Sequence, residues 1–237
     1  MTAAEDSGLP ELETAAQPTA LLETIPFISL GGAVLSLFLF GWIAESVSHD
    51  RTARFDLSVR MRIHEYASPG LTKAMITISF LGGYGLAIAA ILAFVLFLLF
   101  RWRRATLWLV VTILGATVLD LSLKYAFHRA RPTPFFVDLP STYSFPSGHA
   151  LYSFCFYGVL AGLLMGRTRS KRARILIWLS AAVLVSAIGL SRIYLGVHYP
   201  SDVIAGYLTA ALWVSTLLAL DRLRTVSKSR KGPGATP

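Results

Sequence analysis

Cysteine is nearly missing from this sequence: Cys155 is the only one, and it lies within an apolar run. A single cysteine excludes an intramolecular disulfide and a cysteine-based metal site. Charged residues are also scarce, at 15% of the chain against about 25% in an ordinary soluble domain, whereas apolar residues make up 54%. This imbalance predicts a protein whose main solvent is lipid.

Basic residues are absent from residues 1–24, which carry five acidic residues instead. A secretory signal peptide begins with a basic segment, so we expect no cleaved signal peptide here. We predict that residues 1–24 form a disordered acidic cytoplasmic tail. Residues 25–221 are then the membrane domain, and residues 222–237 are a basic cytoplasmic tail.

The net charge of +9 raises the question of nucleic acid, but the Lys and Arg residues sit in short clusters between apolar runs. Such clusters are typical of cytoplasmic loops that fix the topology and contact anionic lipid headgroups. No nucleic-acid-binding motif accompanies them. The expected partners are the bilayer and a membrane lipid, with no nucleic acid, and the sequence leaves the oligomeric state open.

Six apolar segments meet or approach the length of about 20 residues that a helix needs to cross a hydrocarbon core of about 30 Å. Their ranges are 25–44, 74–100, 105–123, 150–166, 175–190 and 203–220. The runs are continuous and lack the alternation of barrel strands. We therefore predict an all-α bundle of six transmembrane helices.

The orientation of the bundle follows from the basic residues. With six spans, both termini share one face with the second and fourth loops, and this face carries 13 Lys and Arg residues against nine on the other. The richer face is expected to be cytoplasmic. The first, third and fifth loops then lie outside.

The first outer loop has helical periodicity of its own. Phe55, Val59, Ile63 and Tyr66 recur at helical spacing among several arginines. The pattern predicts an amphipathic helix. Two uses stay open: a helix in the membrane interface that guides lipid, or a surface helix that covers the bundle.

The other outer loops concentrate polar residues. Lys124, Arg131 and Arg192 are cations near membrane level with few acids to neutralise them, and charge at that depth is usually functional. Arginine offers phosphate oxygens a planar pair of donors, and lysine adds a point charge. Ser147 and Gly148 begin the fourth span, where free backbone N–H groups attract anions. The predicted ligand is a phosphate.

Two histidines supply reactive groups. Asp202 lies four residues after His198, in the first turn of a helix that Pro200 is expected to open. Its carboxylate can hold one ring nitrogen of His198 and leave the other free to attack. His149 is then the group that protonates the leaving oxygen and later activates water.

Asp120 stands one helical turn before Lys124, so their side chains share a face and can pair. We expect Asp120 to support the site by holding the Lys124 ammonium in place and keeping it charged. The alternative is that Asp120 bonds a neighbouring helix without any effect on the chemistry.

These motifs carry a family resemblance. The sequence resembles the PAP2 superfamily of type-2 phosphatidic acid phosphatases, whose signature is K-x6-RP, then PSGH, then SR-x5-H-x3-D. All eleven specified positions match: Lys124, Arg131, Pro132, Pro146, Ser147, Gly148, His149, Ser191, Arg192, His198 and Asp202.

The resemblance implies a phosphohistidine on His198, with Asp202 as its orienter and His149 as acid and base. It also implies a phosphate site that needs no cofactor and no metal ion, formed by Lys124, Arg131, Arg192, Ser147 and Gly148. We expect a lipid phosphatase with an outward-facing active site in a bacterial inner membrane.

Several substrates are open. Undecaprenyl pyrophosphate ranks first, ahead of phosphatidylglycerophosphate, phosphatidic acid and lipid A phosphates. Two other functions are considered: a lipid-to-lipid phosphotransferase with the same intermediate, and a non-catalytic lipid-binding or transport protein. The complete set of motifs argues against the non-catalytic alternative, because such a protein does not need His198 and Asp202.

Overall fold

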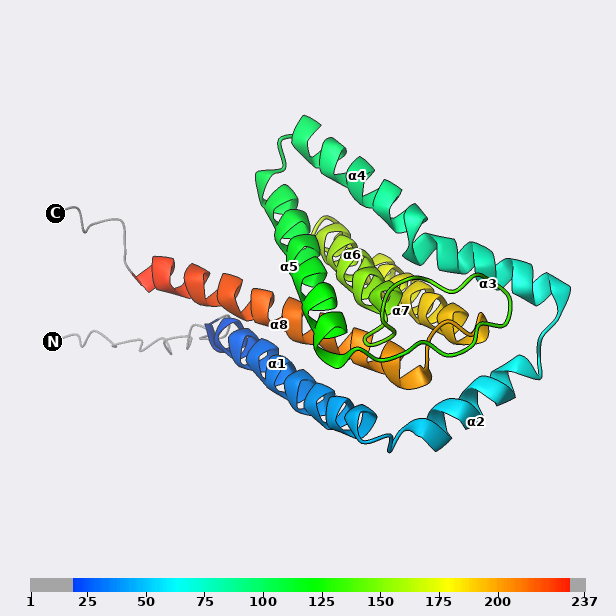
Figure 1. The fold of residues 1–237 in the computed structure, drawn as a ribbon. Coiled ribbons are helices and arrows are strands. Elements are labelled where there is room, and N and C mark those ends of the chain that lie inside the picture. Colours follow the sequence, from blue (N-terminus) through cyan, green and yellow to red (C-terminus); the bar gives the residue numbers. More distant parts are fainter. Residues whose placement is uncertain (1–18, 231–237) are drawn as a thin grey trace, which may run out of the picture.

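The computed structural model describes residues 19–230. Within that range the chain forms eight helices and no strand (Figure 1). They are α1 (Thr19–Ser48), α2 (Ala53–His64), α3 (Pro69–Gly82), α4 (Tyr84–Leu99), α5 (Arg103–Phe127), α6 (Gly148–Met165), α7 (Lys171–Tyr194) and α8 (Pro200–Arg230).

Six segments are long and apolar enough to cross a membrane: Ile28–Ser48, Pro69–Leu99, Arg103–Phe127, Gly148–Met165, Lys171–Tyr194 and Pro200–Arg224. Many of their large apolar side chains point outward, and Leu35, Ile88 and Val118 are more than half exposed. Such an outer surface is what a bundle presents to lipid. The predicted all-α fold with six membrane-spanning helices is confirmed.

The ends of several helices lie beyond the predicted spans. α1 begins at Thr19, inside the predicted acidic tail, and α8 continues to Arg230, inside the predicted basic tail. Residues 1–18 and 231–237, on which the rest of these two predictions falls, lie outside the described residues. α7 has 24 residues instead of 16. Hydrophobicity marks only the part of a helix that crosses the hydrocarbon, and the helices continue past it.

The second span consists of two helices rather than one. α3 ends at Gly82 and α4 begins at Tyr84, with Gly83 between them. A Cβ atom at Gly82 would lie 2.3 Å from Cγ2 of Ile188 on α7, and one at Gly83 would lie 2.9 Å from Nε2 of His149 on α6. The two glycines therefore allow the broken span to pass close to α7 and to His149.

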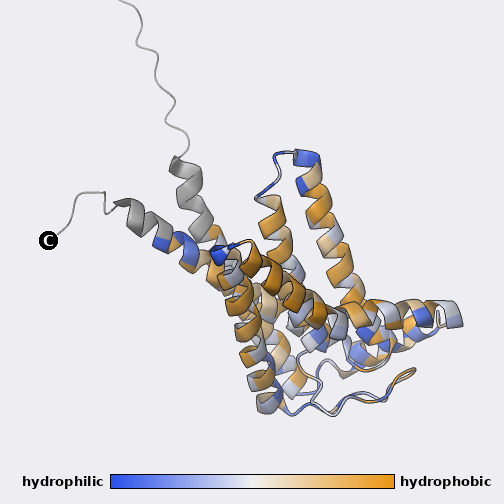
Figure 2. Cartoon of the chain, turned by 90° about the horizontal axis from the view of Figure 1, so that it is seen from above, coloured by the Kyte–Doolittle hydropathy of each residue, from blue (hydrophilic) through white to orange (hydrophobic). Residues whose placement is uncertain are grey.

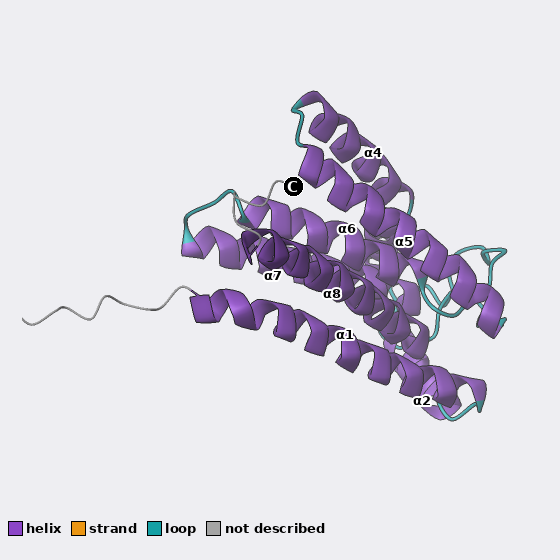
Figure 3. Cartoon of the chain, turned by 90° about the vertical axis from the view of Figure 1, so that its left-hand side faces the viewer, coloured by secondary structure: helices purple, strands orange, loops and turns teal. Residues whose placement is uncertain are grey.

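The bundle is arranged around α6, which packs against α5, α7 and α8 (Figure 1). α1 runs antiparallel along α8, α3 packs on α7, and α4 packs on α5. The side view in Figure 3 places α2 and the loop from α5 to α6 near one end of the bundle, with the turn from α6 to α7 at the other. The predicted alternation of loops between two faces is confirmed.

α2 confirms the helix predicted in the first outer loop, and only part of its apolar face, including Ile63, packs against the bundle. Phe55 and Tyr66, both predicted on the apolar face, are 48% and 69% exposed, whereas Asp56 and Arg60 are buried. The periodicity of apolar residues located the helix, and the partners of the charged residues set its rotation.

Polar side chains are buried at the end of the bundle where α2 and the loops after α5 and α7 meet. Figure 2 shows hydrophobic residues along the spans and hydrophilic ones at helix ends and in loops. Burying a charge is costly unless it is paired. The buried polar residues at this end include Asp56, Lys124, Ser144, Ser147, Arg192, His198 and Asp202.

Candidate active site

His198 and Asp202 lie side by side at this polar end. His198 belongs to the short connection between α7 and α8, and Asp202 lies in the first turn of α8, which Pro200 opens as predicted. Nδ1 of His198 is 3.4 Å from Oδ2 of Asp202, and Nε2 is 3.0 Å from Nη1 of Arg131. One ring nitrogen thus faces a carboxylate, and the other faces a cation.

The His198 imidazole is neutral near pH 7. Burial lowers its pKa to about 4; Asp202 opposes the shift, and the positive charges of Arg131 and Arg192 add to it. With the ring proton on Nδ1, toward Asp202, Nε2 carries a lone pair. This arrangement is the one that a nitrogen nucleophile requires.

The carboxylate of Asp202 is fully buried and is held by several donors. Oδ2 accepts hydrogen bonds from Oγ of Ser144 at 2.5 Å and from the backbone N–H of Tyr199 at 2.9 Å. Oδ1 accepts one from Nη1 of Arg129 at 2.5 Å. These contacts fix the carboxylate in front of His198.

Lys124 and Asp120 form the ion pair that their spacing predicts. The Lys124 ammonium donates to Oδ1 of Asp120 and to the carbonyl oxygen of Pro146, the latter at 3.0 Å. Gly148 also lies against this pair, since a Cβ atom there would be 3.1 Å from Oδ1 of Asp120. The pair therefore links α5 to the start of α6.

Arg131 comes from a loop, because α5 ends at Phe127 and His128 follows in a left-handed conformation with φ 46°. Its guanidinium donates to the carbonyl oxygens of Thr142 and Val197 at 2.6 and 2.9 Å. These contacts join both outer loops and hold Nη1 beside His198.

The start of α6 differs in one respect from the expected anion seat. The backbone N–H of Ser147 donates to the carbonyl oxygen of Asp202 at 2.9 Å, so this group is already used within the protein. Oγ of Ser147, by contrast, is buried without a hydrogen-bond partner. Gly206 lets α8 approach the backbone of Ser147 this closely, since a Cβ atom at Gly206 would lie 2.6 Å from the carbonyl oxygen of Ser147.

His149 lies in the first turn of α6, against the break between α3 and α4. It interacts electrostatically with four groups of the site, which are Arg192, His198, Arg131 and Lys124. Arg192, near the end of α7, donates from Nη1 to Oγ of Ser79 at 2.5 Å, and its Nε is buried without a partner. The structure therefore brings together all nine residues predicted for the site.

The positive charge of the site comes from Lys124, Arg131 and Arg192. Within residues 19–230, no group of three or more His, Cys, Asp or Glu side chains is placed to hold a metal ion. Three cations around a neutral, buried imidazole suit a phosphate group.

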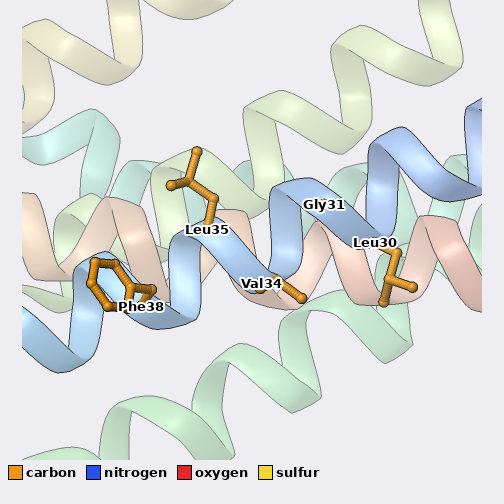
Figure 4. Close-up of a pocket in the computed structure, with 5 residues that line it drawn as sticks. All are labelled: Leu30, Gly31, Val34, Leu35 and Phe38. Atoms are coloured by element: carbon orange, nitrogen blue, oxygen red, sulfur yellow. The ribbon is translucent and has the colours of Figure 1, made fainter.

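A hollow on α1 is separate from this site. It is lined by Leu30, Gly31, Val34, Leu35 and Phe38, as Figure 4 shows. These residues belong to the first membrane span and include no polar side chain. The hollow suits an apolar lipid chain and has nothing to hold a phosphate.

Comparison with known proteins decides the family. Residues 105–225, which include all eleven motif positions, match the PAP2 superfamily. The chain belongs to this superfamily. It is a phosphate ester hydrolase of the membrane, as its PAP2 relatives are.

Two PAP2 relatives and one solved structure illustrate the likeness. Phosphatidylglycerophosphatase B of Bacillus subtilis is 29% identical over 177 residues, covering 73% of this chain and 87% of that protein. Undecaprenyl-diphosphatase of Sulfolobus acidocaldarius is 37% identical over 145 residues, covering 58% and 66%. The crystal structure of a transmembrane PAP2 type phosphatidylglycerolphosphate phosphatase from Bacillus subtilis matches the fold with a TM-score of 0.73 at 24% identity, covering 81% and 96%.

Several residues around the PAP2 motifs were missed by the sequence analysis. Arg129 could have been recognised from the sequence, because it is a further cation inside the K-x6-RP motif. Asp56 could have been recognised too, as the single carboxylate within the arginine-rich stretch 51–62. Ser79 and Ser144 could not, since an isolated serine in a span or a loop is common.

Proposed function

We propose that this PAP2 protein removes phosphate from a lipid phosphate or pyrophosphate through a phosphohistidine on His198. The observation that carries the proposal is the environment of that ring. Nδ1 faces Asp202, and Nε2 lies 3.0 Å from Nη1 of Arg131, where a bound phosphate would meet it.

In the first step, Nε2 of His198 attacks the terminal phosphorus while the bond to the leaving oxygen breaks, which is the ester oxygen of a monoester or the bridging oxygen of a pyrophosphate. His149 gives its proton to that oxygen as it leaves. Lys124, Arg131 and Arg192 balance the charge on the other phosphoryl oxygens, and the Ser147 hydroxyl donates to one of them. Asp202 stabilises the positive imidazole that forms.

In the second step, water attacks the phosphorus atom of the phosphohistidine. His149, now without its proton, accepts one from the water, and the bond between phosphorus and Nε2 breaks. Inorganic phosphate leaves, and His198 regains its lone pair. The three side-chain cations supply the positive charge for both steps, so we propose a reaction without a metal ion.

We propose further that the site faces outward and that both termini are cytoplasmic. Five of the nine basic residues on the site's face are buried or half-buried within the protein: Arg60, Lys124, Arg129, Arg131 and Arg192. The other four are exposed, which leaves the 13 basic residues of the opposite face in a larger excess. An outward site in a bacterial inner membrane meets undecaprenyl pyrophosphate where its recycling begins, so this lipid ranks first among the substrates.

Phosphate release from purified protein in detergent tests the proposal. The panel contains undecaprenyl pyrophosphate, phosphatidylglycerophosphate, phosphatidic acid and a soluble phosphate ester. We expect fast release from a lipid and transient label on His198 from a substrate with radioactive phosphorus. His198→Ala should abolish both, and Asp202→Asn should retain about 10⁻⁴ to 10⁻³ of the rate. Ready labelling of His198→Ala would refute the mechanism.

A further inference from the structure

α2 buries a carboxylate although it lies at the edge of the bundle. Asp56 is fully buried, whereas its sequence neighbours Phe55 and Leu57 are about half exposed. Oδ1 of Asp56 accepts a hydrogen bond from the backbone N–H of Ser201 at 2.9 Å, and Oδ2 accepts one from Oγ of Ser201 at 2.7 Å. Since Ser201 lies in the first turn of α8, Asp56 binds the helix start that carries Asp202.

Arg129 connects Asp56 to Asp202. Nη2 donates to Oδ2 of Asp56 at 2.8 Å, and Nη1 donates to Oδ1 of Asp202 at 2.5 Å. The guanidinium also stacks over the Tyr199 ring, 4.2 Å from its centre. Burial lowers the pKa of Arg129, but the two carboxylates raise it by more, so the cation is permanent.

Asp202 divides its two oxygens between different tasks. Oδ2 faces His198 and accepts from Ser144, while Oδ1 is bound by Arg129. Rotation of the carboxylate would break the bond to Arg129. Arg129 is in turn held by Asp56, which comes from a separate helix.

We propose that Asp56 and Arg129 are a positioning pair that fixes the Asp202 carboxylate and thereby the orientation and charge of His198. The pair lies behind Asp202, and Arg129 reaches His198 only through that carboxylate. It is therefore expected to affect kcat more than KM. The proposal rests on His198 as nucleophile.

The charges around His198 determine in which direction its pKa moves when Asp56 or Arg129 loses its charge. The groups that face His198 are Asp202 on α8, Arg131 in the α5–α6 loop, Arg192 on α7 and His149 on α6. Removing the Arg129 charge makes the potential at the ring more negative, which raises the pKa of His198. Removing the Asp56 charge makes the potential more positive, which lowers it.

The test uses Asp56→Asn, which keeps the shape of the side chain and removes its charge, and Arg129→Gln, which removes the charge together with the two-sided donor contact. We expect kcat to fall about 100-fold and about tenfold, respectively, with KM within about threefold of wild type. The acid limb of the kcat/KM profile should move to higher pH in Arg129→Gln and to lower pH in Asp56→Asn. The double variant should lose less than the product of the two single losses.

Two matched variants complete the experiment. Arg62→Gln removes an exposed arginine from the same helix α2, and it should leave kcat and the pH profile unchanged. Arg129→Lys keeps the charge without the planar fork, so it should lose rate but retain the wild-type acid limb. If Arg129→Gln fails to fold, Arg129→Lys still tests whether the planar fork of Arg129 is needed for the rate.

Unchanged rates in Arg129→Gln and Asp56→Asn would overturn the positioning pair. So would a loss of activity that follows the loss of folded protein in thermal unfolding, with the pH profile unmoved. Failure of the proposed mechanism is distinguishable, because the wild-type protein would then carry no label on His198.

Discussion

The ammonium of Lys124 donates a hydrogen bond to the carboxylate of Asp120 one turn earlier on α5, and each side chain is at most one-tenth exposed. The same ammonium donates to the carbonyl oxygen of Pro146, just before α6 begins. Asp120 is not part of the PAP2 signature. It thus fixes a signature lysine against the segment that carries His149.

Asp120→Asn is expected to lower turnover at least about tenfold, because the buried Lys124 loses its counterion and is held less firmly. The carboxamide keeps the shape of the carboxylate, so the protein should still fold. Steady-state rates with a lipid phosphate, together with thermal unfolding, measure both effects.

Asp138→Asn is the matched control for Asp120, since Asp138 is an exposed residue of the loop before α6. It should behave as wild type. A wild-type rate and KM in Asp120→Asn would instead support the alternative that Asp120 only bonds a neighbouring helix.

The pH dependence of His198 gives a second prediction. Its pKa is lowered from 6.5 to about 4 by burial, so the ring stays neutral and nucleophilic between these two values. The pH profile of kcat/KM reports the ionisation of groups in the free protein. If His198 is the nucleophile, kcat/KM should therefore persist below pH 6 and fall only near pH 4. The ¹⁵N shifts of labelled His198 report this titration directly, with His198→Ala to assign the signal. A midpoint near 6.5 would contradict the prediction.

Metal removal provides a third prediction. The activity is expected to persist in EDTA, because Lys124, Arg131 and Arg192 supply the positive charge of the site. Vanadate should inhibit the enzyme, since it adopts the five-coordinate geometry of the transition state. Activity lost on chelation and restored by magnesium would show that the side-chain cations are insufficient.

The helices and the main site residues could be predicted from the sequence for physical reasons. A membrane span must be apolar over about 20 residues, so its signal is local and strong. Asp120 and Lys124 are four residues apart on one helix, so their contact follows from helix geometry, and His198 lies close enough in sequence to the first turn of α8 for Asp202 to reach it.

The contacts of Asp56 and Arg129 could not be predicted in this way. Their hydrogen bond spans 73 residues, and it depends on how α2 rotates against α8. The apolar spacing of α2 did not indicate which face would be buried, because an exposed Phe55 is tolerated beside lipid. The break at Gly83 was missed for a related reason, since His149, which lies against it, is far away in sequence.

The orientation of the bundle yields a fourth prediction. A cysteine at Pro140, in the loop before α6, should react with a membrane-impermeant thiol reagent added outside intact cells. A cysteine at Ser170, in the turn before α7, should react only after the cells are opened. The native Cys155 is buried and gives little background. The reverse pattern would place the site at the cytoplasmic face and remove outer-leaflet lipids from the substrates.

Gly83→Ala is the last prediction, and it tests whether the break between α3 and α4 serves His149. The added Cβ would lie 2.9 Å from Nε2 of His149, so the imidazole has to move while the helices keep their places. Because the proposed mechanism has His149 transfer protons in both steps, kcat should fall about 10- to 100-fold, with the melting temperature nearly unchanged. Gly41→Ala on α1 is the control, because a Cβ there meets nothing within 4 Å. Equal rates in the two variants would show that the position of His149 does not depend on the break.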